Sequence, residues 1–384
     1  MPGKFRSTAL LAAVAALTGG FLLPVAQADA ASPSSVVVVS GLNNPRGLAL
    51  AGNQLLIAEA GIGGPVIVTN PNGSKNGFGY TGSISAVLDP AEAAHQSPNR
   101  VVTGLLSSAS ATESQGGPVG SAASGADGIA ARSPGDLAIL VTTYGNLPES
   151  MQAQAGRLQL AHPDQQPRSV ADIAGYERTH DPDHQGVDTN PYSVIAYRDG
   201  WLVADAAANS VLRVDRDGDV SLFHVFANIT DGPCAGRSDP SPDFPGCNFV
   251  PDALAVDRLG NVYVAGLGSL VPGAGRVVEL DSGGEQRASW TGFNSVTGVA
   301  AGADGSIYVS QLFASPSTPG SYTPGVLTKV DQAGQRTDLD VPLPASVVVD
   351  RQDNVYVSAY SLSTGSGNGV PGVDTSGQVW RVRF

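Results

Sequence analysis

The stretch Pro-Asp-Ala-Leu-Ala-Val-Asp-Arg-Leu-Gly-Asn-Val-Tyr-Val-Ala at residues 251–265 decides the fold of this chain. A short apolar run, a tight turn at Leu259-Gly260-Asn261 and a second apolar run are typical of a β-hairpin. Its opening recurs six times: a proline or small residue, a variable residue, a small residue and then apolar residues. The six copies are Pro45–Ala49, Ala126–Ala130, Pro191–Ile195, Pro251–Ala255, Val296–Ala300 and Pro344–Val348. Their mean spacing of about 60 residues indicates a repeat architecture.

Each copy is followed by a turn and a second strand, and further strands recur, as in Val211–Val214 and Val220–Val225. Helical periodicity is nearly absent. The pattern therefore predicts an all-β chain, a six-bladed β-propeller with four antiparallel strands per blade, as one domain over residues 31–384. The unpartnered run Val36–Val39 is expected to pair with Gln378–Phe384 as the outer strand of the last blade. That pairing would close the ring and cover two strand edges.

The composition supports a folded, turn-rich and acidic protein. The chain has 384 residues, with 48 glycines, 27 prolines and 42% hydrophobic residues, so turns and a large core are both provided for. The formal net charge is −13, from 34 acidic and 21 basic residues. This balance argues against nucleic acid or an anionic membrane as a partner, because phosphate binding needs basic patches.

Residues 1–30 have the features of a signal peptide. Lys4 and Arg6 precede an apolar stretch, and small residues allow cleavage after Ala28 or Ala30. An uncleaved anchor is the alternative. We expect a secreted, extracytoplasmic monomer with no membrane insertion after cleavage.

Cys234 and Cys247 are the only cysteines, thirteen positions apart in a segment rich in proline and aspartate. In an oxidising compartment they are expected to form a disulfide, although two free thiols are the alternative. Neither the spacing nor a nearby histidine pair supports a metal site there.

Propeller topology places most of the long loops, Ala60–Thr81 and Ala174–Asn190 among them, on one face, where the first strand of each blade begins. Long loops tend to carry function, so this face is the candidate binding face. The variable repeat residues and their neighbours should converge on its axial mouth. These candidate ligand-binding residues are Arg46, Glu59, Asp127, Asp188, Asn190, Tyr192, Asp205, Asp252 and Thr297, with Ala345 and Gln311 at equivalent places.

Two interpretations of this mouth remain open. Carboxylates around one axis could hold a divalent cation such as calcium, with Glu59, Asn190, Asp205 and Asp252 as candidate ligands. Alternatively the charged groups pair locally, for example Arg46 with Glu59, and no ligand binds.

Two loops carry weaker metal signals. His180-Asp181-Pro182-Asp183-His184 groups two imidazoles and two carboxylates in a long loop. Asp215, Asp217 and Asp219 imitate the start of a calcium loop, but Gly218 is misplaced for one, so a hairpin turn is expected.

Several runs resemble the ScyD/ScyE-like family of NHL-like propellers, whose founding members are encoded beside genes for the pigment scytonemin. They are Gly41–Ala49, Ala58–Gly61, Ala174–Glu177, Asp188–Val194, Val203–Asn209 and Leu212–Asp215. The resemblance covers about Val38 to Phe384. It implies a six-bladed, extracytoplasmic propeller and names no ligand.

The sequence lacks a ready-made nucleophile motif. It favours a non-catalytic binding or accessory propeller that takes a small molecule, glycan or protein on its loop-rich face. The alternative is a metal-assisted hydrolase or lyase resembling gluconolactonase-like propellers. A bound cation at the axis would favour the enzyme.

Overall fold

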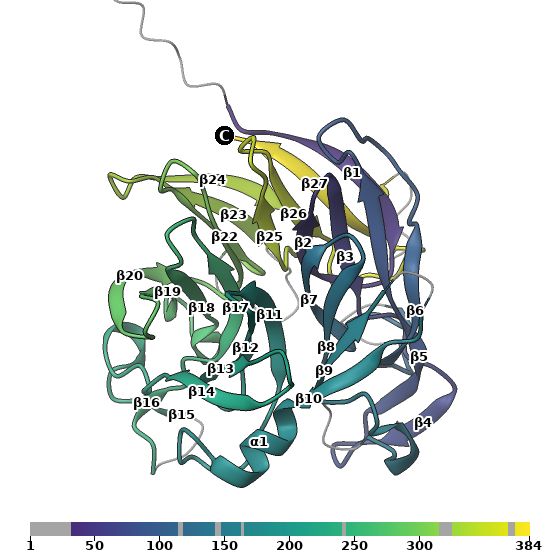
Figure 1. Ribbon diagram of the computed structural model, residues 1–384, viewed down its shortest axis with the longest axis horizontal. Helices are drawn as coiled ribbons and strands as arrows, with labels where there is room; N and C mark the ends of the chain where they lie inside the picture. Colours follow the sequence, from purple (N-terminus) through teal and green to yellow (C-terminus); the bar gives the residue numbers. More distant parts are fainter. Residues whose placement is uncertain are drawn as a thin grey trace, which may run out of the picture. The chain divides into compact units, whose positions relative to one another are not determined.

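The computed structural model describes residues 32–113, 118–142, 147–162, 165–239, 243–314, 325–367 and 373–384. The predicted signal peptide lies outside the described residues. Within Pro33–Phe384, six antiparallel sheets surround a central axis, which confirms the predicted six-bladed propeller (Figure 1). No helix in the described ranges is both long and apolar enough to cross a membrane.

Each blade contributes four strands in order from the axis outward. The innermost strands are β2 (Pro45–Ala51), β7 (Ala126–Ser133), β11 (Pro191–Tyr197), β17 (Pro251–Val256), β21 (Val296–Ala301) and β25 (Val347–Val349). The second strands are β3 (Gln54–Glu59), β8 (Asp136–Val141), β12 (Gly200–Asp205), β18 (Val262–Gly266), β22 (Ile307–Gln311) and β26 (Val355–Ala359). The third strands are β5 (Lys75–Leu88), β9 (Arg157–Ala161), β13 (Ser210–Val214), β19 (Gly275–Leu280), β23 (Gly325–Val330) and β27 (Gly377–Arg383). The outer strands are β6 (Arg100–Ser110), β10 (Arg168–Asp172), β14 (Val220–Val225), β20 (Gln286–Phe293), β24 (Arg336–Val341) and β1 (Ser34–Leu42).

The ring is closed as predicted, by β1 pairing antiparallel with β27. Val37 faces Trp380 and Val39 faces Val379 in this ladder. The outer edge of β1 is also covered, because the Gln96 amide donates to the Val38 carbonyl at 2.9 Å and the Ser40 amide donates to the Gln96 carbonyl at 3.1 Å. No long edge of β1 is therefore left unpaired.

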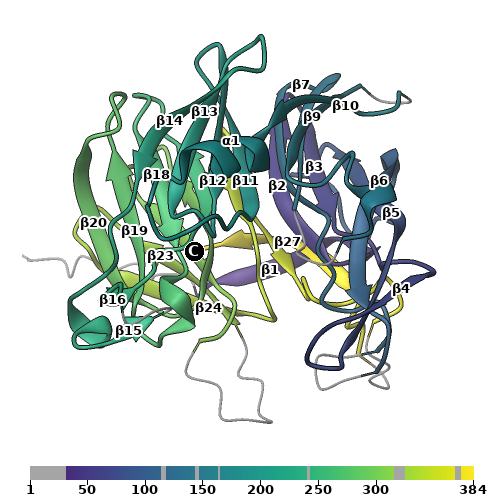
Figure 2. The same cartoon turned by 90° about the horizontal axis from the view of Figure 1, so that it is seen from below.

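The elements outside the four-stranded pattern lie in the connections. They are β4 (Val66–Thr69), η1 (Glu149–Met151), α1 (Ile173–His180), η2 (Gly232–Cys234), β15 (Ser238–Asp239), β16 (Gly246–Cys247) and η3 (Gly268–Leu270). The segment Ala60–Thr81, predicted as a loop, instead contains β4 and the first half of β5, which pair as a hairpin. Similarly, the predicted loop Ala174–Asn190 begins within α1. Figure 2 shows β4, β15 and β16 at one end of the blades.

The hydrophobic core is divided among the junctions between neighbouring blades. Between blades 6 and 1, Val38, Leu55 and Tyr356 pack together, all fully buried. Between blades 3 and 4, a comparable cluster includes Leu202 and Val264. Each sheet therefore packs on both faces, which explains why the second strands carry consecutive apolar residues, such as Leu55–Ala58 in β3 and Leu202–Ala204 in β12.

Candidate functional site

The six innermost strands line an axial cavity of about 330 Å³. All six variable repeat residues are among its lining residues: Arg46, Asp127, Tyr192, Asp252, Thr297 and Ala345. These residues come from six different blades, so the convergence depends on the closed ring.

A backbone irregularity accompanies the variable position. In the first five blades, the register between inner and second strand shifts at the variable residue; in blade 4 it shifts between Pro251 and Ala253, at Asp252. A β-bulge of this kind redirects a side chain out of the regular alternation of a strand. The repeat is therefore built to present one residue per blade to the cavity.

The small residue that follows is explained by crowding between inner strands. A Cβ on Gly47 would lie 2.7 Å from the Asp127 carbonyl oxygen, one on Gly128 would lie 2.9 Å from that of Tyr192, and one on Gly298 would lie 2.5 Å from that of Ala345. In two other blades the small residue is serine, and the Ser193 hydroxyl accepts the Leu254 amide at 3.2 Å. Neighbouring blades thus meet backbone to backbone around the cavity.

Arg46 and Asp127 form the charged pair of the cavity. Arg46 Nε lies 3.6 Å from Asp127 Oδ1, and both side chains are buried. Asp127 also accepts hydrogen bonds from the Thr142 hydroxyl and the Gly125 amide. Burial raises the pKa of Asp127, although Arg46 acts in the opposite direction. The predicted pairing of Arg46 with Glu59 is wrong, because each has another partner.

Asp252 differs from Asp127 because its own backbone amide, rather than a basic side chain, favours its charged form. Its side chain is 7% exposed, and its Oδ1 is buried without a hydrogen-bond partner. Among the described residues no basic side chain forms an ion pair with it, and burial raises its pKa well above the usual value. Asp127 Oδ1 also lacks a hydrogen-bond donor, but it faces Arg46 Nε at 3.6 Å, whereas among the described residues Asp252 Oδ1 has no opposite charge beside it.

Tyr192 lies between the two aspartates and Arg46. Burial raises the pKa of its phenol to about 12, and the charges of Arg46, Asp127 and Asp252 all act on it. Thr297, across the ring, is satisfied locally because its hydroxyl donates to the Pro344 carbonyl at 2.9 Å. One side of the cavity is therefore polar, and the other is closed by Thr297 and Ala345.

The other four candidates, Glu59, Asp188, Asn190 and Asp205, do not line the cavity. Glu59 is fully buried within blade 1 and pairs with Arg100 at 2.7 Å. Asp205 accepts the Thr189 hydroxyl at 2.5 Å, and Asp188 is exposed on the preceding loop. The four residues named as candidate cation ligands are thus not gathered on the axis, since Asp252 alone lies there.

Glu59, Asp205 and Gln311 instead share a structural role that the sequence reasoning missed. Each ends a second strand, and each accepts at 2.7 Å the amide of an asparagine just before the first strand of its own blade. The asparagines are Asn43, Asn190 and Asn294. Their recurrence one or two positions before the inner strand is the sequence signal that could have revealed these three hydrogen bonds.

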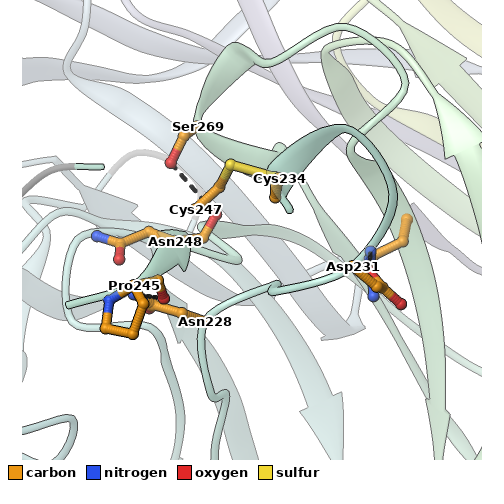
Figure 3. The surroundings of a disulfide bond; sticks show 8 residues. Asn228, Asp231, Cys234, Pro245, Cys247, Asn248 and Ser269 are labelled. Carbon is orange, nitrogen blue, oxygen red and sulfur yellow. Dashed lines mark hydrogen bonds and ion pairs between the residues drawn. A yellow bond between two sulfur atoms is a disulfide. The ribbon is translucent and has the colours of Figure 1, made fainter. Parts of the chain in front are cut away.

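The predicted disulfide between Cys234 and Cys247 is present, with a Cα–Cα distance of 5.6 Å (Figure 3). Both cysteines are fully buried, and the Cys247 backbone pairs with Ile229 in both directions. They pack in the cluster that contains the stacked rings of Phe226 and Phe249. The disulfide fastens the connection between blades 3 and 4.

The two weaker metal signals resolve differently. Asp215 Oδ1 accepts the amides of Asp217 and Asp219, which confirms the predicted hairpin turn. In the histidine-containing loop, the His180 ring stacks on Tyr176 with centroids 4.0 Å apart. The carboxylates of Asp181 and Asp183 approach Glu177 instead.

Glu177 is the polar residue that the sequence reasoning overlooked. It lies in the last turn of α1 and is fully buried. Burial, with the charges of Asp205, Asp183 and Asp181, raises its pKa to about 7. The available signal was the spacing of Glu177, Asp181 and Asp183, which places three carboxylates at the end of one short helix.

No family model and no curated protein matches the sequence. Among solved structures, a protein of unknown function from Bacteroides thetaiotaomicron is 10% identical, with a TM-score of 0.51 over 92% of this chain and 76% of that chain. Virginiamycin B lyase from Staphylococcus aureus is 9% identical, with a TM-score of 0.45 over 92% and 99%. Aldose sugar dehydrogenase from Streptomyces coelicolor is 15% identical, with a TM-score of 0.43 over 92% and 99%. These likenesses concern the propeller fold alone, and the resemblance to the ScyD/ScyE-like family stays a prediction.

Proposed function

We propose that this protein is an extracytoplasmic binding propeller that holds a small polar molecule in its axial cavity. The observation that carries the proposal is the buried Asp252 carboxyl with an oxygen that has no donor. A ligand with a hydroxyl or ammonium group would supply the missing donor, and burying a polar group without a partner is otherwise unfavourable.

The rest of the cavity fits such a ligand in size and chemistry. About 330 Å³ lies at the lower end of the range of small-molecule pockets. The Tyr192 phenol lines the same cavity as Asp252, and because Arg46 donates to its oxygen, its hydroxyl can donate one further hydrogen bond. Arg46 is paired with Asp127, so the carboxyl left to face a ligand is that of Asp252. The ligand class is therefore a small polyol or amine rather than an anion.

The placement of the carboxylates weighs against the hydrolase or lyase alternative. Among the described lining residues only Asp127 and Asp252 carry carboxylates. Asp127 is already engaged by Arg46, Thr142 and Gly125. A cation at the axis would thus have one available carboxylate, whereas the metal-assisted alternative requires several ligands there.

Export is proposed on separate grounds. The buried disulfide suits an oxidising compartment, and the first 30 residues have the features of a cleavable leader.

A ligand screen with matched variants tests the binding proposal. Thermal unfolding of the wild-type protein is measured against a panel of monosaccharides and primary amines, and each stabilising compound is then titrated by calorimetry. We expect Asp252→Asn to weaken binding of such a compound by at least about tenfold, the effect of losing one hydrogen bond to a charged group.

The matched control is Asp340→Asn, which removes an exposed carboxylate of β24. It should bind as the wild type does. Equal binding by Asp252→Asn and the wild type would place the ligand elsewhere. If no compound in the panel stabilises the wild type or the variant, and Asp252→Asn changes only the unfolding temperature, the axial carboxyl has a structural role.

A further inference from the structure

Three carboxylates meet at the C-terminal end of α1, away from the axial cavity. One oxygen from each of Glu177, Asp181 and Asp183 lies within 4.8 Å of the others. Glu177 belongs to the last turn of the helix, and Asp181 is its C-cap residue with a left-handed backbone. None of the three lines the axial cavity. The connection they occupy joins blade 2 to blade 3.

Glu177 is the member of this group whose environment calls for a ligand. Its side chain is 0% exposed, and neither carboxylate oxygen has a hydrogen-bond partner. The Asp188 backbone amide is near this carboxylate, but both of its oxygens remain without a hydrogen-bond partner. A buried carboxylate with two unsatisfied oxygens is rare in folded proteins and is expected to have a partner that the polypeptide does not supply.

The nearby cationic side chains are engaged elsewhere. Arg178 pairs with Asp172 at 3.4 Å, and the His180 imidazole stacks on Tyr176. Among the described residues no lysine, arginine or histidine forms an ion pair with any of the three carboxylates. The end of α1 adds partial negative charge from its carbonyl groups, which also repels carboxylates. The three carboxylates and the C-terminal end of the helix therefore together favour a cation at this point.

The two aspartates are held in place while keeping oxygen lone pairs available. Asp183 accepts the Gln185 amide at 3.0 Å and the Asn209 side-chain amide at 2.8 Å. Asp181 Oδ1 accepts the Gly186 amide at 3.3 Å. A carboxylate offers about four lone-pair sites, so each retains capacity for an ion. In the same connection, Gln185 Oε1 and Asn190 Oδ1 are buried acceptors without donors.

We propose that Glu177, Asp181 and Asp183 form a calcium site that fastens the connection between blades 2 and 3. The donor set consists of oxygens from carboxylates, with amide oxygens in the same connection, and this set suits a hard cation rather than zinc or copper. Three ligands spread over a helix end and a loop suit calcium better than magnesium, which demands stricter octahedral geometry.

The ion would stabilise the connection between blades 2 and 3, just as the disulfide stabilises the connection between blades 3 and 4. The connection leads directly into β11, whose second residue is the cavity residue Tyr192. Calcium binding would therefore stabilise the entry to one axial strand. The proposal does not depend on the axial ligand, because it rests on different residues.

Calcium alone is the probe for the test. The full-length purified protein is stripped with EDTA, and its thermal unfolding is followed during titration with CaCl₂ or MgCl₂. We expect calcium to raise the unfolding temperature by a few degrees in a concentration-dependent way, with magnesium less effective. A dissociation constant on the order of 10⁻⁴ to 10⁻³ M would match extracellular calcium modules.

Glu177→Gln keeps the shape of the side chain but removes its charge. We expect this variant to unfold at a higher temperature than the wild type in EDTA, and calorimetry to show calcium binding weakened by at least about tenfold. Glu285→Gln is the matched control, since it makes the same change at an exposed turn position, and it should respond as the wild type does.

Three results would overturn the proposal. One is the absence of any calcium response in the wild type up to about 10 mM, well above the range for extracellular modules. Another is an undiminished response in Glu177→Gln. The third is a response abolished by Asp252→Asn but kept by Glu177→Gln, which would move the ion to the axial cavity. Because Asp252→Asn is expected to leave the calcium response intact, this site and the axial proposal can fail separately.

Discussion

Asp127 and Asp252 occupy equivalent bulged positions in blades 2 and 4, yet their surroundings differ. Asp127 has Arg46, the Thr142 hydroxyl and a backbone amide as partners. Asp252 has a buried oxygen with no partner. Burial raises the pKa of both carboxyls, and for Asp252 no nearby cation opposes the effect. The same residue type is thus ion-paired in one blade and a candidate ligand contact in another.

This difference predicts a pH-dependent effect of Asp252→Asn on stability. The folded-state pKa of Asp252 is raised above its unfolded value, so its contribution to stability is fully present below the unfolded pKa. That contribution is lost as the pH rises through the folded pKa. In the absence of ligand, Asp252→Asn should therefore stabilise the protein near pH 7.5, and much less near pH 4.

Urea unfolding at these two pH values checks the prediction, with Asp340→Asn as the exposed control. A gain in stability that is equal at both pH values would contradict it, because only a shifted titration makes the effect grow with pH.

At the scale of single elements, contact with the neighbouring blade, rather than pairing within their own sheet, constrains the residue types of the inner strands. The glycines that follow the variable residue in blades 1, 2 and 5 are needed where the next blade approaches, as Gly128 shows against the Tyr192 carbonyl. Gly135, in the turn between β7 and β8, has no atom within 4 Å of its would-be Cβ. Within this one hairpin, Gly128 is therefore required by packing against the next blade, whereas Gly135 only reflects the preference of turns for glycine.

Gly128→Ala should destabilise the protein by about 1–3 kcal/mol, because its methyl group would force backbone atoms of two blades apart. Gly135→Ala should change the free energy of unfolding by no more than about 0.5 kcal/mol. Chemical denaturation of both variants measures the difference. Similar costs for the two substitutions would show that blade contact does not constrain this position.

At the scale of the whole molecule, the ring depends on β1, which joins the start of the described chain to its last blade. Val38 of β1 is fully buried between blades 6 and 1, whereas Val36 on the same strand is 40% exposed. Because a propeller has no continuous central core, each blade junction bears a share of the stability. Loss of one junction should weaken the entire ring.

Val38→Ala should therefore lower the stability of the whole propeller by about 2 kcal/mol through lost burial and a cavity, while Val36→Ala should cost well under 1 kcal/mol. Tryptophan fluorescence, measured in a Trp380→Phe background, is one probe of unfolding: Trp380 lies in blade 6, whereas the remaining Trp201 and Trp290 lie in blades 3 and 4. Circular dichroism is the second. The two transitions should shift together in Val38→Ala. A separate early transition, with the tryptophan signal unchanged, would mean that blade 6 opens on its own.

Much of the architecture could be predicted because its information is local and repeated. Hairpin turns, short apolar runs and the six copies of the repeat each depend on residues close in sequence, and repetition made the blade count readable. Closure by Val36–Val39 followed from the one strand without a partner. The disulfide followed from having two cysteines in one connection.

The site depended on relationships between blades, which local patterns do not contain. The sequence shows that Arg46, Glu59 and Asp127 are charged, but the angle between sheets and the bulge in each inner strand decide that Arg46 meets Asp127. The same geometry directs Glu59 to Arg100 inside its own blade. The grouping of Glu177 with Asp181 and Asp183 likewise requires the helix to end where it does. Repeated local preferences determined the propeller, whereas the partner of each buried charge was decided by tertiary packing, because electrostatic pairing depends on distance in space rather than along the chain.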